Sequence, residues 1–134
     1  MMKNISHLLD THAWLWLILG DPRAEAIKNL PDDSIFGISS ITLWETILLH
    51  QKNRIHLHLS PQEFIDTYTE SIGIQIIDLS KPILFELLKL PQTFHDDPDD
   101  RMITATALHH QVPLITADRR IIESGIASLE VMKL

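Results

Sequence analysis

Cysteine is absent from the 134 residues of this chain. The protein therefore forms no disulfide bonds and offers no thiolate ligands to a metal ion. Any metal site must be built from aspartate, glutamate and histidine side chains. Sites rich in carboxylate oxygens suit Mg²⁺ or Mn²⁺ better than zinc. The absence of cysteine also fits a reducing compartment, and we expect a cytoplasmic protein.

Several signatures of other enzyme classes are also missing. The chain contains neither a glycine-rich phosphate-binding loop nor a G-x-S-x-G nucleophile elbow. Its eight histidines include the close pairs His56/His58 and His109/His110, which offer chelating nitrogens. None has the H-E-x-x-H spacing of a zinc hydrolase, so a catalytic zinc site is disfavoured.

Positive charge and long apolar runs are scarce as well. The net charge of −7 argues against a broad basic surface for nucleic acid. It does not argue against an enzyme that binds phosphate groups through metal ions. The apolar run from Ala13 to Leu19 is too short to span a bilayer, so we expect no membrane anchor.

Helices and strands alternate along the chain. The predicted strands cover residues 5–9, 34–38, 74–77, 114–117 and 129–132. The predicted helices cover residues 11–19, 22–30, 41–51, 61 to about 71 and 81–90, one beginning at Pro98, and a short one at 120–123. This order predicts an α/β fold of one domain, residues 1–134. Its mostly parallel central sheet would be covered by helices on both faces.

One acidic stretch, from His95 to Asp118, combines a loop, a helix and a strand. Asp97 is placed as an N-cap, with Pro98 at the first helical position. Acidic residues in a first helical turn are also favoured by the helix dipole, and this structural explanation is as good for Asp97 and Asp99 as a functional one. Asp118 follows a short apolar strand, at the strand end where open α/β sheets bind ligands.

Carboxylates from distant segments are expected to meet at that edge. Asp10 and Asp118 follow predicted strands, whereas Glu45 and Asp100 lie in the first turns of predicted helices that start from the same rim. Like charges at close range are costly unless they bind protons or a cation. Mg²⁺ or Mn²⁺ would supply that cation, lower the pKa of a water and stabilise charge on a phosphate oxygen. The placement indicates metal-assisted phosphodiester hydrolysis.

Four segments together resemble the PIN-domain family, and within it the VapC-type toxins of bacterial toxin–antitoxin pairs. The segments are Leu8–Ala13, Ser39–Glu45, His95–Arg101 and Leu114–Asp118, in matching order and spacing. The resemblance implies a three-layer α/β/α PIN-like fold and a Mg²⁺- or Mn²⁺-dependent endoribonuclease. It also implies a homodimer and a cognate VapB-type antitoxin that covers the acidic cleft.

Residue roles follow from that resemblance. The acidic quartet matches Asp10, Glu45, Asp100 and Asp118. Asp10, Asp100 and Asp118 are the implied metal ligands, and Thr116 and Asp97 support the site. Asp99 departs from the family pattern, because relatives usually carry an apolar or aromatic residue there.

Other interpretations remain open at this stage. His95, Arg101, Arg119 and Arg120 either contact RNA phosphates or serve the fold and the charge balance. The tryptophans fit core or subunit-interface packing better than base stacking. A non-catalytic protein-binding module with this fold is one alternative function. Another is a nuclease that acts on DNA or in RNA maturation without a toxin role.

Overall fold

The computed structural model describes residues 4–70 and 74–134. Five strands form one sheet in the order β3-β2-β1-β4-β5, and every neighbouring pair is parallel. The strands are β1 (His7–Leu9), β2 (Phe36–Ser39), β3 (Ile74–Ile77), β4 (Leu114–Thr116) and β5 (Val131–Lys133). The predicted α/β/α architecture is confirmed, with a sheet that is entirely parallel.

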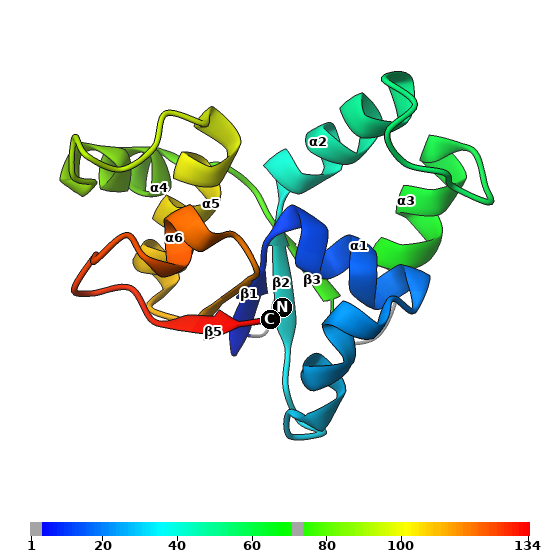
Figure 1. The fold of residues 1–134 in the computed structure, drawn as a ribbon, viewed down its shortest axis with the longest axis horizontal. Helices are drawn as coiled ribbons and strands as arrows, with labels where there is room; N and C mark the ends of the chain where they lie inside the picture. Colours follow the sequence, from blue (N-terminus) through cyan, green and yellow to red (C-terminus); the bar gives the residue numbers. More distant parts are fainter. Residues whose placement is uncertain (1–3, 71–73) are drawn as a thin grey trace.

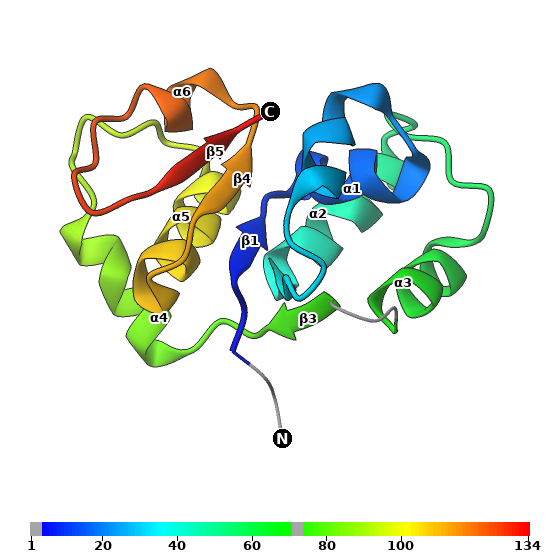
Figure 2. The same cartoon turned by 90° about the horizontal axis from the view of Figure 1, so that it is seen from below.

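Helices connect the strands and cover both faces of the sheet. The α-helices are α1 (Thr11–Leu19), α2 (Ser40–Gln51), α3 (Pro61–Thr69), α4 (Lys81–Glu86), α5 (Pro98–His110) and α6 (Arg119–Ile122). Two 3₁₀ helices are η1 (Pro22–Asn29) and η2 (Leu87–Lys89). Helices α1, α2 and α3 gather on one side of the molecule, and α4, α5 and α6 gather on the other (Figures 1 and 2).

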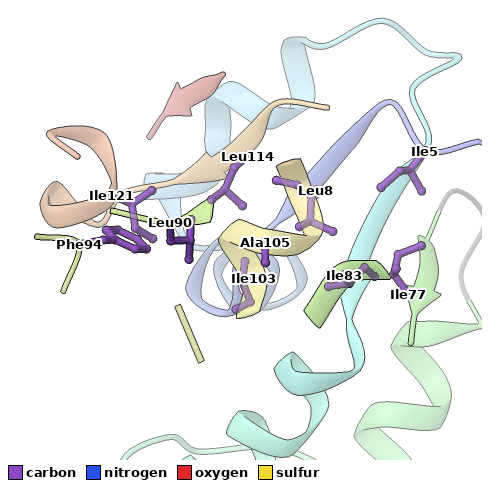
Figure 3. Close-up of a cluster of buried hydrophobic side chains, with 11 residues drawn as sticks. Ile5, Leu8, Ile77, Ile83, Leu90, Phe94, Ile103, Ala105, Leu114 and Ile121 are labelled. Carbon is purple, nitrogen blue, oxygen red and sulfur yellow. The ribbon is translucent and has the colours of Figure 1, made fainter. Parts of the chain in front are cut away.

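The core divides at the sheet because neighbouring residues of a strand point to opposite faces. Leu8 and Leu114 belong to the cluster under α4, α5 and α6, which includes Ile83, Ile103 and Ile121 (Figure 3). The adjacent residues of the same two strands, Leu9 and Ile115, belong to the other cluster. That cluster contains Trp14, Ile27, Ile38 and Phe64 from α1, η1, β2 and α3. Both faces of the central strands are therefore buried, as their continuous apolar sequences require.

Capping residues define the starts of the helices. Side chains of Asp10, Ser39, Ser60 and Asp97 each accept a hydrogen bond from a backbone N–H in the first turn that follows. Helix α1 ends at Gly20, whose φ of 73° is left-handed and favours glycine. The predicted end of α3 at Ser71 lies outside the described residues.

A few predicted boundaries differ from the observed ones. The last strand begins at Val131 rather than Leu129, because the Leu129 N–H closes a turn onto the Ile126 carbonyl. The first strand begins at His7 rather than Ile5. The predicted helix at 81–90 is α4 followed by the 3₁₀ turn η2.

A candidate metal centre at the carboxyl ends of the strands

The four carboxylates of the predicted quartet line one cavity of about 420 Å³. Asp10 directly follows β1, and Asp118 lies two residues beyond β4. Glu45 comes from α2 and Asp100 from the first turn of α5. Since parallel strands all end at one edge and the helices begin there, segments far apart in sequence meet in this cavity. The remaining lining residues are Thr11, His12, Trp16, Arg23, Asp97, Ala117 and Arg120.

Asp10 is a buried carboxylate with only 5% of its surface exposed. Its Oδ1 accepts a hydrogen bond from the Ala13 N–H at 2.8 Å, so the residue caps α1. Its Oδ2 accepts a hydrogen bond from the Thr116 hydroxyl at 2.5 Å. Burial raises the pKa of Asp10, although these two hydrogen bonds by themselves would lower it. The Thr116 oxygen also accepts from the Asp118 N–H at 3.0 Å and thereby links the two acids.

Glu45 is held by a hydroxyl in the same way. The Thr11 hydroxyl donates to Glu45 Oε1 at 2.6 Å, and the Thr11 and Thr42 hydroxyl oxygens lie 3.1 Å apart. Burial raises the pKa of Glu45 to about 8, assisted by the charges of Asp99 and Asp100. Asp99, the residue that departs from the family pattern, adds a negative charge beside Glu45, and burial raises the pKa of Asp99 as well.

The charge of Asp118 is compensated by an arginine side chain. Arg120 Nη2 lies 3.1 Å from Asp118 Oδ2, and the Arg120 backbone N–H donates to Asp118 Oδ1 at 2.8 Å. Partial burial alone would raise the pKa of Asp118, but the hydrogen bonds and charge of Arg120 outweigh burial and lower it. Of the four acids, Asp100 and Asp118 form ion pairs with Arg120. Within residues 4–70 and 74–134, no lysine or arginine forms an ion pair with Asp10 or Glu45.

Asp100 lies close to the other acids and keeps an elevated pKa. Arg120 Nη2 is 3.6 Å from Asp100 Oδ2. Burial raises the pKa of Asp100 to about 7, with further contributions from the negative charges of Asp97 and Asp118. Near neutral pH this cavity therefore holds carboxylates that are only partly ionised. A divalent cation would compensate their charge, and the oxygen-rich donor set fits Mg²⁺ or Mn²⁺.

Among the described residues, a close group of potential ligand atoms combines His95, Asp100 and Asp118. One atom from each of them lies within 4.8 Å of the other two. Asp10 lines the same cavity but lies outside this close group. Burial lowers the pKa of His95, which favours the neutral imidazole.

Asp97 serves the helix as well as the cavity. Its Oδ1 accepts hydrogen bonds from the backbone N–H groups of Asp99 and Asp100, each at 3.0 Å. The capping explanation is therefore sufficient for Asp97, and the cap also fixes the orientation of the helix turn that carries Asp100.

The arginines of the acidic stretch have different surroundings. Arg101 Nη1 donates to the carbonyl oxygens of Phe94 and His95, each at 3.2 Å, and so braces the loop before α5. Arg119 pairs with Glu123 at 3.1 Å on the exposed side of α6. Arg120, of the three, lines the cavity.

Trp16 and Arg23 line the cavity although neither was predicted from the sequence as a site residue. The Arg23 guanidinium lies 4.1 Å from the centre of the Trp16 ring, and the His12 and Trp16 rings are 5.9 Å apart. The spacing of His12 and Trp16, four residues apart in a helix capped by Asp10, is the sequence signal that places both near the acid. Trp14 is fully buried, whereas Trp44 is 50% exposed.

A family model for the PIN domain matches residues 7–125 of the chain. Among curated proteins, the chain is 27% identical over 119 residues to "Ribonuclease VapC22" of Mycobacterium tuberculosis. That alignment covers 85% of this chain and 88% of the relative.

Solved structures share the fold over nearly the whole chain. A toxin–antitoxin complex from Klebsiella pneumoniae contains a chain that is 25% identical, with a TM-score of 0.69 and coverage of 96% and 97% of the two chains. VapBC-1 from nontypeable Haemophilus influenzae aligns with a TM-score of 0.72 at 21% identity, covering 95% and 96%.

Proposed function

This chain belongs to the PIN domain family, and we propose that it is a divalent-metal-dependent endoribonuclease, the toxin of a VapBC-type toxin–antitoxin pair. Its relative in Mycobacterium tuberculosis is named as a ribonuclease. The solved relatives from Klebsiella pneumoniae and Haemophilus influenzae were determined as toxin–antitoxin complexes or VapBC assemblies.

The observation that carries the proposal is the meeting of Asp10, Glu45, Asp100 and Asp118 in one cavity with too few cations to balance them. Burial raises the pKa of Asp10, and it raises the pKa of Glu45 to about 8 and that of Asp100 to about 7. A bound cation would stabilise the ionised form of these acids, so the cavity favours a cation. A bound Mg²⁺ or Mn²⁺ would lower the pKa of a water and neutralise charge on the scissile phosphate.

The residues around the metal centre would have different roles. Asp10, Asp100 and Asp118 would hold the cation, while Glu45 would orient the attacking water and receive its proton. Thr116 positions Asp10 and Asp118, and Asp97 positions the turn that carries Asp100. Arg23 and Arg120 line the cavity and would contact RNA phosphates. Water attack breaks the P–O bond without using the 2′-hydroxyl, so the products carry no cyclic phosphate.

Exposed apolar side chains offer surfaces for an antitoxin and for a second subunit. Trp44 precedes Glu45 and is 50% exposed, which offers an apolar anchor for an antitoxin segment that covers the acids. Leu84, Phe85 and Leu88 are exposed apolar side chains of α4 and η2. Such side chains are typical of a subunit contact, and we propose a homodimer that uses them.

Cleavage of a mixed RNA pool by the purified protein tests the proposal. We expect cutting in Mn²⁺ and none in EDTA, with phosphate monoester ends and no cyclic phosphate. Asp10→Asn should lose the activity while it remains folded. Asp66→Asn, an exposed aspartate of α3, is the matched control and should cut like the unmodified protein.

The contrary results are equally clear. Unchanged cutting by folded Asp10→Asn, or cutting in EDTA, would contradict a metal-dependent site at these residues. Tight Mn²⁺ binding without cutting any RNA in the pool would favour the non-catalytic binding module.

A further inference from the structure

His95 is the only nitrogen donor of the close group that it forms with Asp100 and Asp118. It lies in the loop between η2 and α5, next to the buried ring of Phe94, with a ring-to-ring distance of 4.6 Å. Arg101 donates hydrogen bonds to the carbonyl oxygens of both Phe94 and His95. The loop is thus tied to α5, and the imidazole has a defined position.

The ring nitrogens of His95 have no hydrogen-bond partner among the described residues, although both are buried. The side chain is only 11% exposed, so a phosphate of RNA has little access to it. Nε2 nevertheless lies 3.5 Å from Asp100 Oδ2, too far for a good hydrogen bond but close to the acids. A buried polar nitrogen without a partner is unfavourable and calls for a ligand.

We propose that His95 is a direct nitrogen ligand of the divalent cation and that it completes a mixed nitrogen–oxygen site with Asp100 and Asp118. The proposal deepens the proposed function, since it concerns the same metal centre. Ligand atoms of the three residues already lie within 4.8 Å of one another. With bonds of about 2.1 Å, neighbouring ligands of one ion are about 3.0 Å apart and opposite ligands about 4.2 Å apart. His95 Nε2 and Asp100 Oδ2, at 3.5 Å, already lie between these two separations.

Arg120 holds the same carboxylates, at 3.1 Å from Asp118 and 3.6 Å from Asp100. Its side chain is 59% exposed and therefore free to turn toward solvent when a cation binds. His95 is not among the residues that line the open cavity, so it would approach the ion from the protein side. The exposed side would remain available to water and substrate.

A nitrogen ligand changes the preference of the site among metals. Carboxylate and water suit Mg²⁺, whereas imidazole favours transition metals. The proposal therefore predicts a stronger preference for Mn²⁺ over Mg²⁺ than an all-oxygen site would have. Replacement of His95 should reduce that preference.

Electron spin-echo envelope modulation of Mn²⁺ added to the metal-free protein tests the assignment directly. We expect a coupling to directly bound ¹⁴N, which changes to a ¹⁵N pattern when the histidines are labelled. His95→Gln should lose the coupling and bind Mn²⁺ about tenfold more weakly, with a smaller loss for Mg²⁺. His109→Gln, an exposed histidine at the far end of α5, should keep the coupling.

The unmodified protein makes the test independent of how well the variant folds. Bound Mn²⁺ without nitrogen coupling would overturn the role of His95 and leave the nuclease proposal standing. Coupling that persists in His95→Gln but disappears in His12→Gln would overturn it in favour of the other histidine at the cavity. If no Mn²⁺ bound and no RNA were cut, the metal centre and the proposed function would both fail.

Discussion

The two sides of the acidic cavity balance their charges by different means. On one side, Asp10 and Glu45 accept hydrogen bonds from the neutral hydroxyls of Thr116 and Thr11, and their pKa values are raised by burial. On the other, Asp118 pairs with Arg120, and its pKa is lowered despite partial burial. A hydroxyl fixes a carboxylate in place without neutralising it. The negative charges of Asp10 and Glu45 therefore remain uncompensated until a cation binds. The charge of Asp118 is already compensated in part by Arg120.

The largest expected effect is a loss of RNA cleavage on both sides of the cavity, accompanied by opposite changes in protein stability. Glu45→Gln and Asp118→Asn should each reduce Mn²⁺-dependent RNA cleavage by about 100-fold or more, because each removes a group of the metal centre. The stability of the metal-free protein at pH 8 should move in opposite directions. Glu45→Gln removes an uncompensated acid and should raise the free energy of unfolding, whereas Asp118→Asn removes the partner of Arg120 and should lower it.

Chemical denaturation beside the cleavage assay measures both quantities. Asp66→Asn serves as the control for each. Stability changes of the same sign in the two variants would remove the distinction between the two sides.

Thr116→Val should weaken Mn²⁺ binding by about tenfold, the usual effect of losing a group that orients metal ligands. The Thr116 hydroxyl donates to Asp10 and its oxygen accepts from the Asp118 N–H, so one change loosens both acids. Calorimetric titration with Mn²⁺ measures the loss. Thr106→Val removes an equally buried hydroxyl that bonds to the Met102 carbonyl within α5. An equal loss in both variants would point to general destabilisation.

Arg120→Ala should strengthen Mn²⁺ binding by roughly threefold in the absence of RNA. The guanidinium occupies the carboxylates that the ion needs, and the effect is modest because the side chain is exposed and screened. Titrations at low and moderate salt measure it. Arg119→Ala removes the neighbouring charge, which pairs with Glu123 instead, and should change the affinity less. Weaker binding in Arg120→Ala would show that Arg120 supports the ion rather than competing with it.

The smallest expected effect is a pH dependence of stability. Folded-state pKa values of about 8 for Glu45 and about 7 for Asp100 exceed the ordinary 4.5 and 3.8. Between these limits Glu45 and Asp100 bind more protons in the folded state than in the unfolded state, so their contribution to the free energy of unfolding of the metal-free protein falls as pH rises from about 5 to 8. After allowance for solvent screening we expect a loss of roughly 1–2 kcal/mol, or about 5 °C in Tm.

Thermal unfolding across this pH range measures the loss. Saturating Mn²⁺ should raise Tm more at pH 8 than at pH 5, because the ion replaces the protons. The double variant Glu45→Gln, Asp100→Asn should show a flatter pH profile. Identical pH profiles in the unmodified protein and the double variant would contradict the raised pKa values.

Local sequence signals predicted the parts of the fold that depend on local chemistry. Asp97 caps α5 as predicted because its side-chain oxygen reaches the first N–H groups, and this reach is set by a few neighbouring residues. The convergence of Asp10, Glu45, Asp100 and Asp118 followed from the parallel sheet, which brings strand ends and helix starts to one edge.

The remaining features depend on tertiary packing that a sequence pattern does not specify. Arg120 rather than Arg101 or Arg119 lines the cavity, because the turn of α6 aims it there while the Phe94 and His95 carbonyls hold Arg101. The burial of His95 likewise depends on Phe94 and on the packing of the loop against α5. The resemblance named Thr116 as a supporting residue, but its hydrogen bond to Asp10, 106 residues away in the chain, does not follow from helix or strand periodicity. The hydrogen bond from Thr11 to Glu45 does not follow from it either.

The most direct test of the metal centre is one titration in which Mn²⁺ is added to metal-free protein and a labelled RNA pool. Cleavage and Mn²⁺ binding are followed in the same buffer. If the carboxylates act through a bound cation, cleavage should be absent at the start and rise with the binding curve. In Asp100→Asn both curves should shift together to higher Mn²⁺ concentration. Cleavage that precedes Mn²⁺ binding, or that is unchanged in Asp100→Asn while binding is lost, would contradict a metal-dependent nuclease at this cavity.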